Sequence, residues 1–317
     1  MTILTRRDFL GVVAGGTAVL AGARWHPTGR TMAKLFVHQT EHHAFRVGGR
    51  RCVALLDGVV HYDAEQFFTN ASADALARAL ERHRIPAPDR IPSPYTCLAV
   101  SDDTGGWTLI DTGMGGLWPN TGRLHRNLVD AGIDPGAVHT VVLTHAHPDH
   151  IGANVDPAGR PVYPDAQFVM WEPEWDFWTT PETLATVPNV FAEVAREHLL
   201  PLREVLTTVT GEKEVAPGVT LVPAPGHTPG HAIVIVHSGR EQLHYISDAV
   251  LHPIHLEEPT WETAYDMDPG KAAETKRAVF DRAAAEEARV LAFHFHPFPS
   301  LGRVPRHGDG WRWEPDG

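Results

Sequence analysis

Thr144-His145-Ala146-His147-Pro148-Asp149-His150 is the densest group of metal-ligand side chains in the chain. It follows an apolar run that we expect to be a buried strand. At the end of a strand, His145 and His147 would project to the same side, close enough to bind one cation. Pro148 suits the first turn of a helix, which would bring Asp149 and His150 toward a second cation. The run therefore predicts a metal centre at a strand end.

Four other segments carry side chains of the same kinds. They read Leu109-Ile110-Asp111-Thr112-Gly113, Pro225-Gly226-His227-Thr228-Pro229-Gly230-His231, Ile246-Ser247-Asp248 and Phe293-His294-Phe295-His296-Pro297. Together with residues 144–150 they resemble the motifs of the metallo-β-lactamase superfamily, in that family's order. The resemblance covers roughly residues 36–303 and implies an α/β fold, the four-layer αβ/βα sandwich.

The resemblance also implies a ligand set. His145, His147 and His227 would hold the first metal, Asp149, His150 and His294 the second, and Asp248 would bridge the two. Asp111 and His231 would support the ligands without binding metal. His296 is the alternative to His294 as the last ligand. Nitrogen and oxygen ligands suit two Zn²⁺ ions, with Fe or Mn as the alternatives.

Such a centre predicts a hydrolase. Two cations lower the pKa of a shared water and polarise a substrate oxygen, so a bridging hydroxide could attack a carbonyl or phosphoryl ester without a Ser or Cys nucleophile. Asp149 and Asp248 are the candidate catalytic residues, with Asp149 also able to return a proton to the leaving group. The alternative from another class is an exported metal-binding protein without turnover.

Three further stretches resemble the branch that contains quorum-quenching lactonases and methyl-parathion-type organophosphate hydrolases. They are residues 152–171, Trp175-Asp176-Phe177-Trp178 and residues 248–259. This resemblance implies cleavage of a lactone or ester, such as an N-acyl homoserine lactone, with phosphotriesters as a side activity. The alternatives are a phosphotriester hydrolase and a glyoxalase-II-like thioesterase. Leu251 departs from the lactonase pattern, which commonly has Tyr there, and His252 and His255 are candidate replacements.

Large aromatic side chains are the candidates for an apolar substrate pocket, although core packing is the ordinary role of each. Those that we single out are Phe67, Phe68, Trp118, Trp171, Trp175 and Trp178, together with His252. They predict a small, neutral or apolar ester or lactone as substrate.

Charge and composition narrow the classes of partner. The 317 residues include 27 Lys plus Arg, 39 Asp plus Glu and 21 His, for a formal charge of −12. Neither this balance nor any clustered basic stripe favours nucleic acid as a partner. No basic cluster lies near the motifs for the anionic substrate of a glutathione thioesterase. The sequence leaves the oligomeric state open, with a dimer as one option.

The N-terminal segment resembles a twin-arginine (Tat) export signal. Arg6 and Arg7 precede the apolar residues 10–21, which end in Ala21-Gly22-Ala23. The apolar stretch is too short for a permanent membrane anchor. We therefore expect residues 1–23 to be recognised by the Tat export machinery and removed, and the protein to be periplasmic or extracellular. Residues 24–35 would be a leader, and residues 36–317 a single domain.

The periodicity of hydrophobic residues, together with the Pro and Gly residues that interrupt helices and strands, predicts the other elements. We expect helices over residues 72–83, 124–131, 182–200 and 271–287, strands over 51–56, 96–100, 107–111, 138–144, 167–171, 219–222, 232–236, 242–246 and 289–292, and a proline-rich loop over 85–94. Cys52 and Cys97 are too few for a disulfide scaffold. Two buried thiols are the expectation, with one bridge as the alternative.

Overall fold

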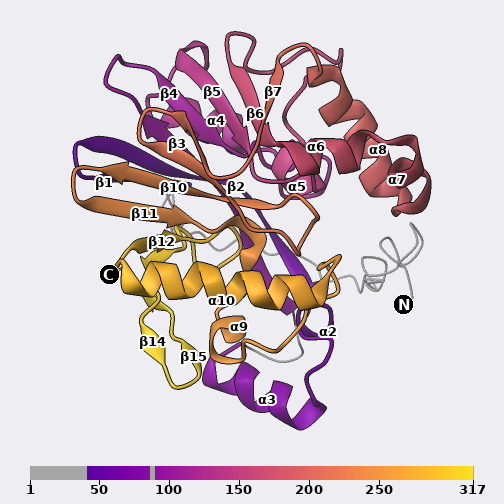
Figure 1. Cartoon of the computed structure of the whole chain (residues 1–317), viewed down its shortest axis with the longest axis vertical. Coiled ribbons are helices and arrows are strands. Elements are labelled where there is room, and N and C mark those ends of the chain that lie inside the picture. The colour runs from indigo at the N-terminus through magenta and orange to yellow at the C-terminus, as the bar shows by residue number, and fades with distance from the viewer. Residues whose placement is uncertain (1–40, 86–89, 317) are drawn as a thin grey trace, which may run out of the picture.

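Two seven-stranded sheets lie face to face in the computed structural model, which describes residues 41–85 and 90–316 (Figure 1). The predicted export signal and the following leader lie outside the described residues. The first sheet has the order β1 to β7: β1 (His42–Val47), β2 (Arg50–Asp63), β3 (Arg90–Ser101), β4 (Trp107–Ile110), β5 (Val138–Leu143), β6 (Gln167–Trp171) and β7 (Leu206–Val209). Strands β1 to β4 pair antiparallel, and β4 to β7 pair parallel.

The second sheet is formed mainly by the C-terminal half of the chain. Its order is β16 (Glu314–Pro315), β13 (Leu301–Arg303), β12 (Arg289–Leu291), β11 (Glu241–Tyr245), β10 (Ala232–Ser238), β9 (Val219–Pro223) and β8 (Lys213–Ala216). Strands β14 (Arg306–His307) and β15 (Gly310–Trp311) form a separate hairpin. Only β11 and β12 pair parallel in this sheet.

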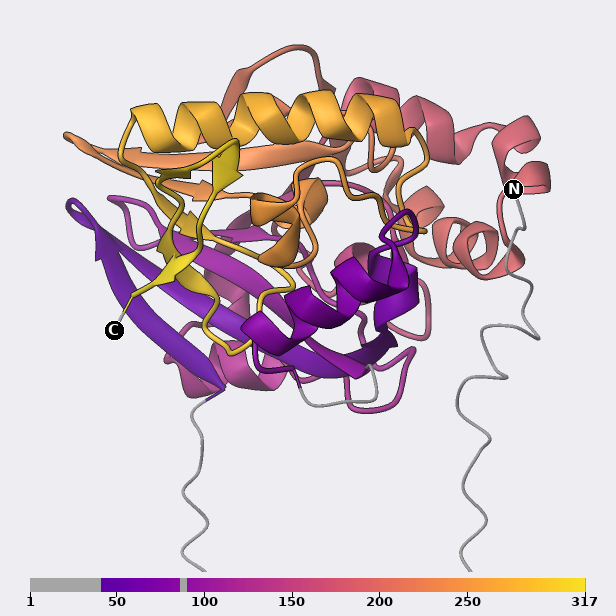
Figure 2. The same cartoon turned by 90° about the horizontal axis from the view of Figure 1, so that it is seen from below.

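Helices cover the outer faces of both sheets, which gives the predicted four-layer αβ/βα order (Figure 2). The α-helices of the described residues are α2 (Ala64–Phe67), α3 (Ala73–Arg82), α4 (Leu124–Asp130), α5 (Pro148–Ile151), α6 (Glu172–Thr179), α7 (Pro181–Thr186), α8 (Asn189–Val194), α9 (Ile254–Glu257) and α10 (Pro269–Ala285). Helix α10 buries Val279 and Phe280 against Val290 of the second sheet. No helix in the described part of the chain is long and apolar enough to cross a membrane.

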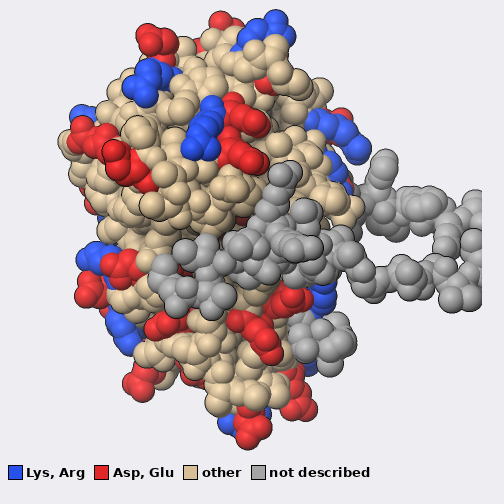
Figure 3. All heavy atoms as spheres, turned by 90° about the vertical axis from the view of Figure 1, so that its right-hand side faces the viewer, with Lys and Arg blue, Asp and Glu red and all other residues tan. Residues whose placement is uncertain are grey.

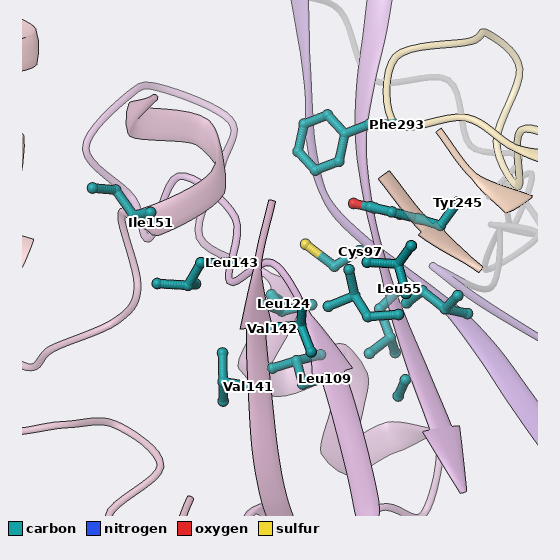
Figure 4. Packing of buried hydrophobic residues seen from close by; sticks show 14 of the residues in the cluster. Leu55, Cys97, Leu109, Leu124, Val141, Val142, Leu143, Ile151, Tyr245 and Phe293 are labelled. Atoms are coloured by element: carbon teal, nitrogen blue, oxygen red, sulfur yellow. The ribbon is translucent and has the colours of Figure 1, made fainter. Parts of the chain in front are cut away.

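The main core fills the space between the two sheets. Leu55 and Leu109 of the first sheet and Tyr245 of the second belong to this cluster, and all three are fully buried (Figure 4). Cys52 and Cys97 are buried there as free thiols, without the alternative bridge. Because apolar side chains from both sheets meet here, the sheets stay fixed relative to each other, and so do the loops at their ends.

Two predicted elements were wrong. Residues 90–94 are not loop but the start of β3, where Pro92 pairs with His61 and Pro94 with Val59. Strand β4 pairs only with residues 98–101 of β3, so these prolines lie where β3 has only β2 beside it in the sheet and the missing N–H groups are tolerated.

The helix predicted over residues 182–200 is interrupted. Helix α7 ends at Thr186, and Pro188 is the N-cap of α8. A proline in the middle of one continuous helix would remove a backbone hydrogen bond and clash with the preceding turn. The chain then continues as a π-helical turn, Ala195–Leu199, and a 3₁₀ turn, Leu200–Leu202.

Candidate metal centre

The ligand-type side chains meet at one edge of the two sheets. Strand β5 ends at Leu143, and His145 and His147 occupy the loop that leads into α5. Pro148 is the first residue of α5, as predicted, so Asp149 and His150 follow in its single turn. The loop between β9 and β10 brings His227, and the segments after β11 and β12 bring Asp248 and His294.

Two groups of side chains converge there, and together they contain the seven predicted ligands. The first is His145, His147, His227 and Asp248; the second is Asp149, His150, His294 and Asp248. Within each group, one ligating atom from every member lies within 4.8 Å of the others. Because Asp248 belongs to both groups, its carboxylate lies where a bridging ligand is needed.

In the first group, His227 Nε2 lies 3.0 Å from His147 Nδ1 and 3.3 Å from Asp248 Oδ2. In the second, Asp248 Oδ1 lies 3.2 Å from His150 Nε2, and Asp248 Oδ2 lies 3.2 Å from His294 Nε2. Asp149 Oδ2 lies 3.5 Å from the same His294 nitrogen. His296, the alternative last ligand, is exposed and belongs to neither group.

The residues fit two divalent cations. His145 Nε2, His150 Nε2 and Asp248 Oδ1 are buried and make no hydrogen bond of normal geometry, although the last two lie 3.2 Å apart. Buried polar atoms are otherwise almost always paired, so unpaired atoms that all point to one place indicate a missing partner. Burial lowers the pKa of His145 and His147, which favours the neutral imidazoles that bind metal.

Most ligand rings are held by a partner on their other nitrogen. The Nδ1 atoms of His150, His227 and His294 lie 2.8, 3.0 and 2.8 Å from Asp111 Oδ2, Asp266 Oδ1 and Ser93 Oγ. Asp111 was predicted as a supporting residue, whereas Asp266 and Ser93 were not predicted. Such contacts fix the tautomer and orientation of a ligating histidine.

His231 also lies beside the centre rather than in it. Its Nε2 accepts a hydrogen bond from the Asp248 N–H at 3.1 Å, and its Nδ1 donates to the carbonyl of Ala224 at 2.9 Å. Burial lowers the pKa of His231 to about 3, which keeps the ring neutral as this pair of bonds requires. The residue therefore fixes the backbone of the bridging aspartate.

A cavity of about 60 Å³ lies over the two groups. Apart from ligand side chains, its walls are aromatic and aliphatic, and they contain no Lys or Arg. The lining residues are Tyr62, Phe67, Met114, His147, Pro148, Asp149, Val190, Phe191, His227, Asp248, Tyr265 and His294. This surface offers no countercharge to an anionic substrate.

Of the aromatic residues predicted to bind substrate, only Phe67 lines this cavity. Phe68 packs against His255 and Trp261 instead, and Leu251 is buried in the same cluster as Phe68. His255 Nε2 donates to the carbonyl of Phe67. These residues contact Phe67 or its cluster but do not line the cavity themselves.

The remaining candidates lie farther away. Trp118 and Trp171 are partly buried against the main core. Trp175 stacks under the Arg203 guanidinium, and Trp178 is buried with its ring nearly perpendicular to that of His147, at a centroid distance of 5.8 Å. His252 lines a different cavity. Their predicted place in the substrate pocket was wrong, because packing determines where each ring points.

Sequence reasoning missed Tyr62 and Tyr265. Tyr62 lies near the end of β2, and its hydroxyl is 2.5 Å from that of Tyr95. Tyr265 lies one residue before Asp266, the partner of His227, and contacts the ring of Tyr62 edge-on. No motif marks either residue. Only the face of β2 and the path of the 258–268 loop place them at the cavity.

Comparison with known proteins agrees with this geometry. The model of the metallo-β-lactamase superfamily matches residues 90–294, and the chain belongs to that superfamily. No curated protein sequence matches the chain significantly.

Solved structures extend the comparison. AidC, a dizinc quorum-quenching lactonase solved with the product N-hexanoyl-L-homoserine, is 26% identical, with a TM-score of 0.78 over 87% of this chain and 97% of AidC. AbOPH, a hydrolase of the β-lactamase superfamily, is 24% identical, with a TM-score of 0.81 over 88% and 98%. An AiiA mutant from B. thuringiensis with N-decanoyl-L-homoserine at its active site is 18% identical, with a TM-score of 0.58 over 81% and 100%. The latter two likenesses concern the fold.

Proposed function

We propose that the protein is a dinuclear metal-dependent hydrolase that cleaves a lactone or another carboxylic ester. One observation carries the proposal: two ligand groups that share Asp248 lie beneath a cavity whose other walls are uncharged and largely aromatic. The likeness to AidC, a dizinc lactonase, over nearly the whole of both chains supports it. A neutral, apolar ester is the substrate class that such walls favour.

Bound at this centre, two divalent cations would supply an activated water and polarise the substrate carbonyl oxygen. The chain would do the rest. His145, His147 and His227 would hold one cation and Asp149, His150 and His294 the other, with Asp248 between them. Asp149 also lines the cavity, so its carboxyl group is placed to return a proton to the leaving alcohol.

Tyr62 and Tyr265 would orient the substrate. Leu251 offers no hydroxyl at the position where the lactonase pattern has one, but both tyrosines line the cavity. Burial raises the pKa of Tyr62 well above its usual value, so the phenol stays protonated. If Tyr95 donates to Tyr62, the Tyr62 O–H is free to donate to a substrate oxygen.

The cavity limits how much of a substrate is enclosed. Its volume of about 60 Å³ is well below the roughly 300–1,000 Å³ of typical ligand pockets. We therefore expect the scissile group alone to lie inside, with the rest of the substrate outside the cavity. Compact esters and lactones should be better substrates than bulky polar ones.

A phosphotriester hydrolase is the second candidate. Leu251 favours it, because the side chain is buried with Phe68 and leaves no hydroxyl group at the lactonase position. Phosphotriesters are neutral as well, so the uncharged walls suit them equally. An anionic glutathione thioester is a poorer match, since the cavity wall offers it no cation.

A substrate panel tests the proposal. The Zn²⁺-loaded protein is assayed on an N-hexanoyl homoserine lactone, an aromatic carboxylic ester, a paraoxon-like triester and a β-lactam. We expect the lactone or the carboxylic ester to give the highest kcat/KM. A higher kcat/KM on the triester would favour the second candidate, and no turnover of any of the four by a fully metal-loaded protein would contradict both.

We also propose that the protein is exported through the twin-arginine route and acts in the periplasm or outside the cell. The support is the order of Arg6, Arg7 and the short apolar run that follows. Replacing both arginines by lysine should retain a full-length precursor in the cytoplasm, as seen by cell fractionation. Unchanged fractionation of this variant would contradict the proposal.

A further inference from the structure

Glu174, on α6, is a buried carboxylate outside the predicted ligand set. It is 0% exposed. Its Oε1 accepts hydrogen bonds from the Ala146 N–H at 2.9 Å and from Trp178 Nε1 at 2.7 Å. Its Oε2 accepts from the Thr228 hydroxyl at 2.7 Å and from the Gly230 N–H at 2.9 Å.

These four donors occupy all the strong acceptor positions of a carboxylate. A proton on either oxygen would displace one of them. The four bonds therefore stabilise the ionised form, against the burial that raises the pKa of Glu174. None of the four is a cationic side chain. The charge is stabilised entirely by oriented N–H and O–H dipoles, an arrangement that tolerates little displacement of the donors.

The donors belong to the loops that carry the first ligand group. Ala146 lies between His145 and His147, and Thr228 directly follows His227. One loop leaves the first sheet after β5, and the other joins β9 to β10 in the second sheet. Glu174 therefore connects the ligand loops of two different sheets through one side chain.

Close packing around Gly230 supports this arrangement. A Cβ atom at Gly230 would lie 2.1 Å from the Glu174 backbone nitrogen and 2.4 Å from its Cα. The absence of a side chain at position 230 is what lets α6 reach the β9–β10 loop. Trp178, which donates to the same carboxylate, also packs nearly perpendicular to the His147 ring, with the ring centroids 5.8 Å apart.

We propose that Glu174 is a positioning residue for the first metal: it holds the 145–147 loop and the 227–230 loop at the separation at which His145, His147 and His227 bind one cation. The inference rests on the dinuclear centre of the proposed function but not on its substrate. The second group has other supports, since Asp111 holds His150 and Ser93 holds His294. Loss of Glu174 should therefore weaken one metal site more than the other.

The test compares Glu174→Gln with a matched control, Asp57→Asn. Asp57 is also 0% exposed and accepts from the backbone N–H groups of Met114, Gly122 and Leu124, but it contacts neither ligand loop. In Glu174→Gln, an NH₂ group replaces an acceptor and faces the donors that the carboxylate bound. Both full-length variants are loaded with Zn²⁺ and equilibrated against graded chelator, and bound metal and thermal unfolding are measured with and without metal.

We expect Glu174→Gln to lower the affinity of one of the two metals by roughly 10- to 100-fold and to leave the other within a factor of about two. Asp57→Asn should lower the unfolding temperature but change neither affinity. Two unchanged affinities in Glu174→Gln would overturn the inference, as would equal losses at both sites or a loss matched by Asp57→Asn.

If Glu174→Gln does not fold, the metal affinities of Thr228→Val are measured instead. It removes a single donor with little change in volume, and we expect a smaller loss at the same one metal site. Unchanged affinities in Thr228→Val would then overturn the inference. A wild-type protein that never binds two metals would instead contradict the proposed dinuclear centre, so the two failures are distinguishable.

Discussion

Two histidine-rich regions lie on opposite sides of the β2–β3 ribbon, and only one of them is built to bind metal. Tyr62 and His61 are neighbours on β2, so their side chains point to opposite faces. Tyr62 lines the small cavity over the ligand groups, whereas His61 lines a larger cavity of about 800 Å³. The larger cavity is also lined by His83, His252 and His296.

The two regions differ in whether their ligating atoms converge. At the metal centre, ligating atoms lie within 4.8 Å of one another, and partners such as Asp111 hold the other ring nitrogens. In the larger cavity, His83 is bonded to Glu257, and its ring centroid is 5.7 Å from that of His252. No third cluster of converging ligands occurs among the described residues. Convergence of ligating atoms, rather than the number of histidines, distinguishes the metal centre from the larger cavity.

The largest expected effect tests this difference directly. His227→Ala should lose one metal and reduce kcat/KM by more than about 100-fold, because loss even of an outer-shell partner costs roughly 10- to 100-fold. His61→Ala, on the other side of the ribbon, should keep both metals and full activity. Metal content and steady-state kinetics measure both outcomes. Equal metal loss in the two variants would remove the distinction between the regions.

A second prediction concerns the groups that orient the ligands. Asp266→Ala removes the acceptor for His227 Nδ1 and should weaken metal binding by roughly 10- to 100-fold. Asp266→Asn should lose less, since the amide oxygen can still accept that bond. Competition with a chelator measures the affinities. If alanine and asparagine weakened binding equally, the hydrogen bond would not be what orients the ring.

A third prediction tests the role of the Tyr62 hydroxyl in the cavity wall. Tyr62→Phe keeps the ring but removes the hydroxyl beside Tyr95. If this hydroxyl binds a substrate oxygen, kcat/KM should fall by about 10-fold, the cost of one hydrogen bond of about 1.4 kcal/mol. Metal content should not change. An unaltered kcat/KM on the best substrate would assign the hydroxyl to packing alone.

The smallest expected effect belongs to the larger cavity. Burial, with contributions from His83 and His296, lowers the pKa of His252 to about 3. The unfolded chain binds this proton near pH 6.5 and the folded chain does not, so the stability contribution is complete above pH 6.5 and declines as the pH falls toward 3. We expect His252 to cost roughly 1 kcal/mol of stability between pH 6.5 and 5.5.

Denaturant unfolding at several pH values measures this slope. The stability of His252→Leu should be less sensitive to acid than that of the wild type. Parallel pH profiles for the wild type and His252→Leu would show that this ring accepts its proton without cost to the folded state.

The side chains that converge at this centre could be predicted from the sequence because they lie in short motifs beside strands. His145 to His150 are contiguous, and their geometry follows from one strand end and one proline. Supporting residues were not predictable in this way. Ser93 meets His294 across 201 positions and Asp266 meets His227 across 39, so only the folded chain brings these pairs together.

The cavity wall and some elements also escaped prediction for physical reasons. Whether an aromatic ring lines a cavity depends on which way its strand or helix faces, which is why Phe67 lines it and Phe68 does not. The prolines of residues 90–94 resembled a loop, yet they are tolerated where β3 has only β2 beside it. On the face shown in Figure 3, the Lys and Arg side chains of the described residues are scattered among Asp and Glu.

The central claim is that two cations share Asp248 between two separate ligand groups. Anomalous X-ray scattering at the zinc edge, from crystals of the Zn²⁺-loaded protein, tests it most directly. The account predicts two peaks, one among His145, His147 and His227 and one among Asp149, His150 and His294, with the Asp248 carboxylate between them. A single peak, or a peak among the histidines of the larger cavity, would contradict it.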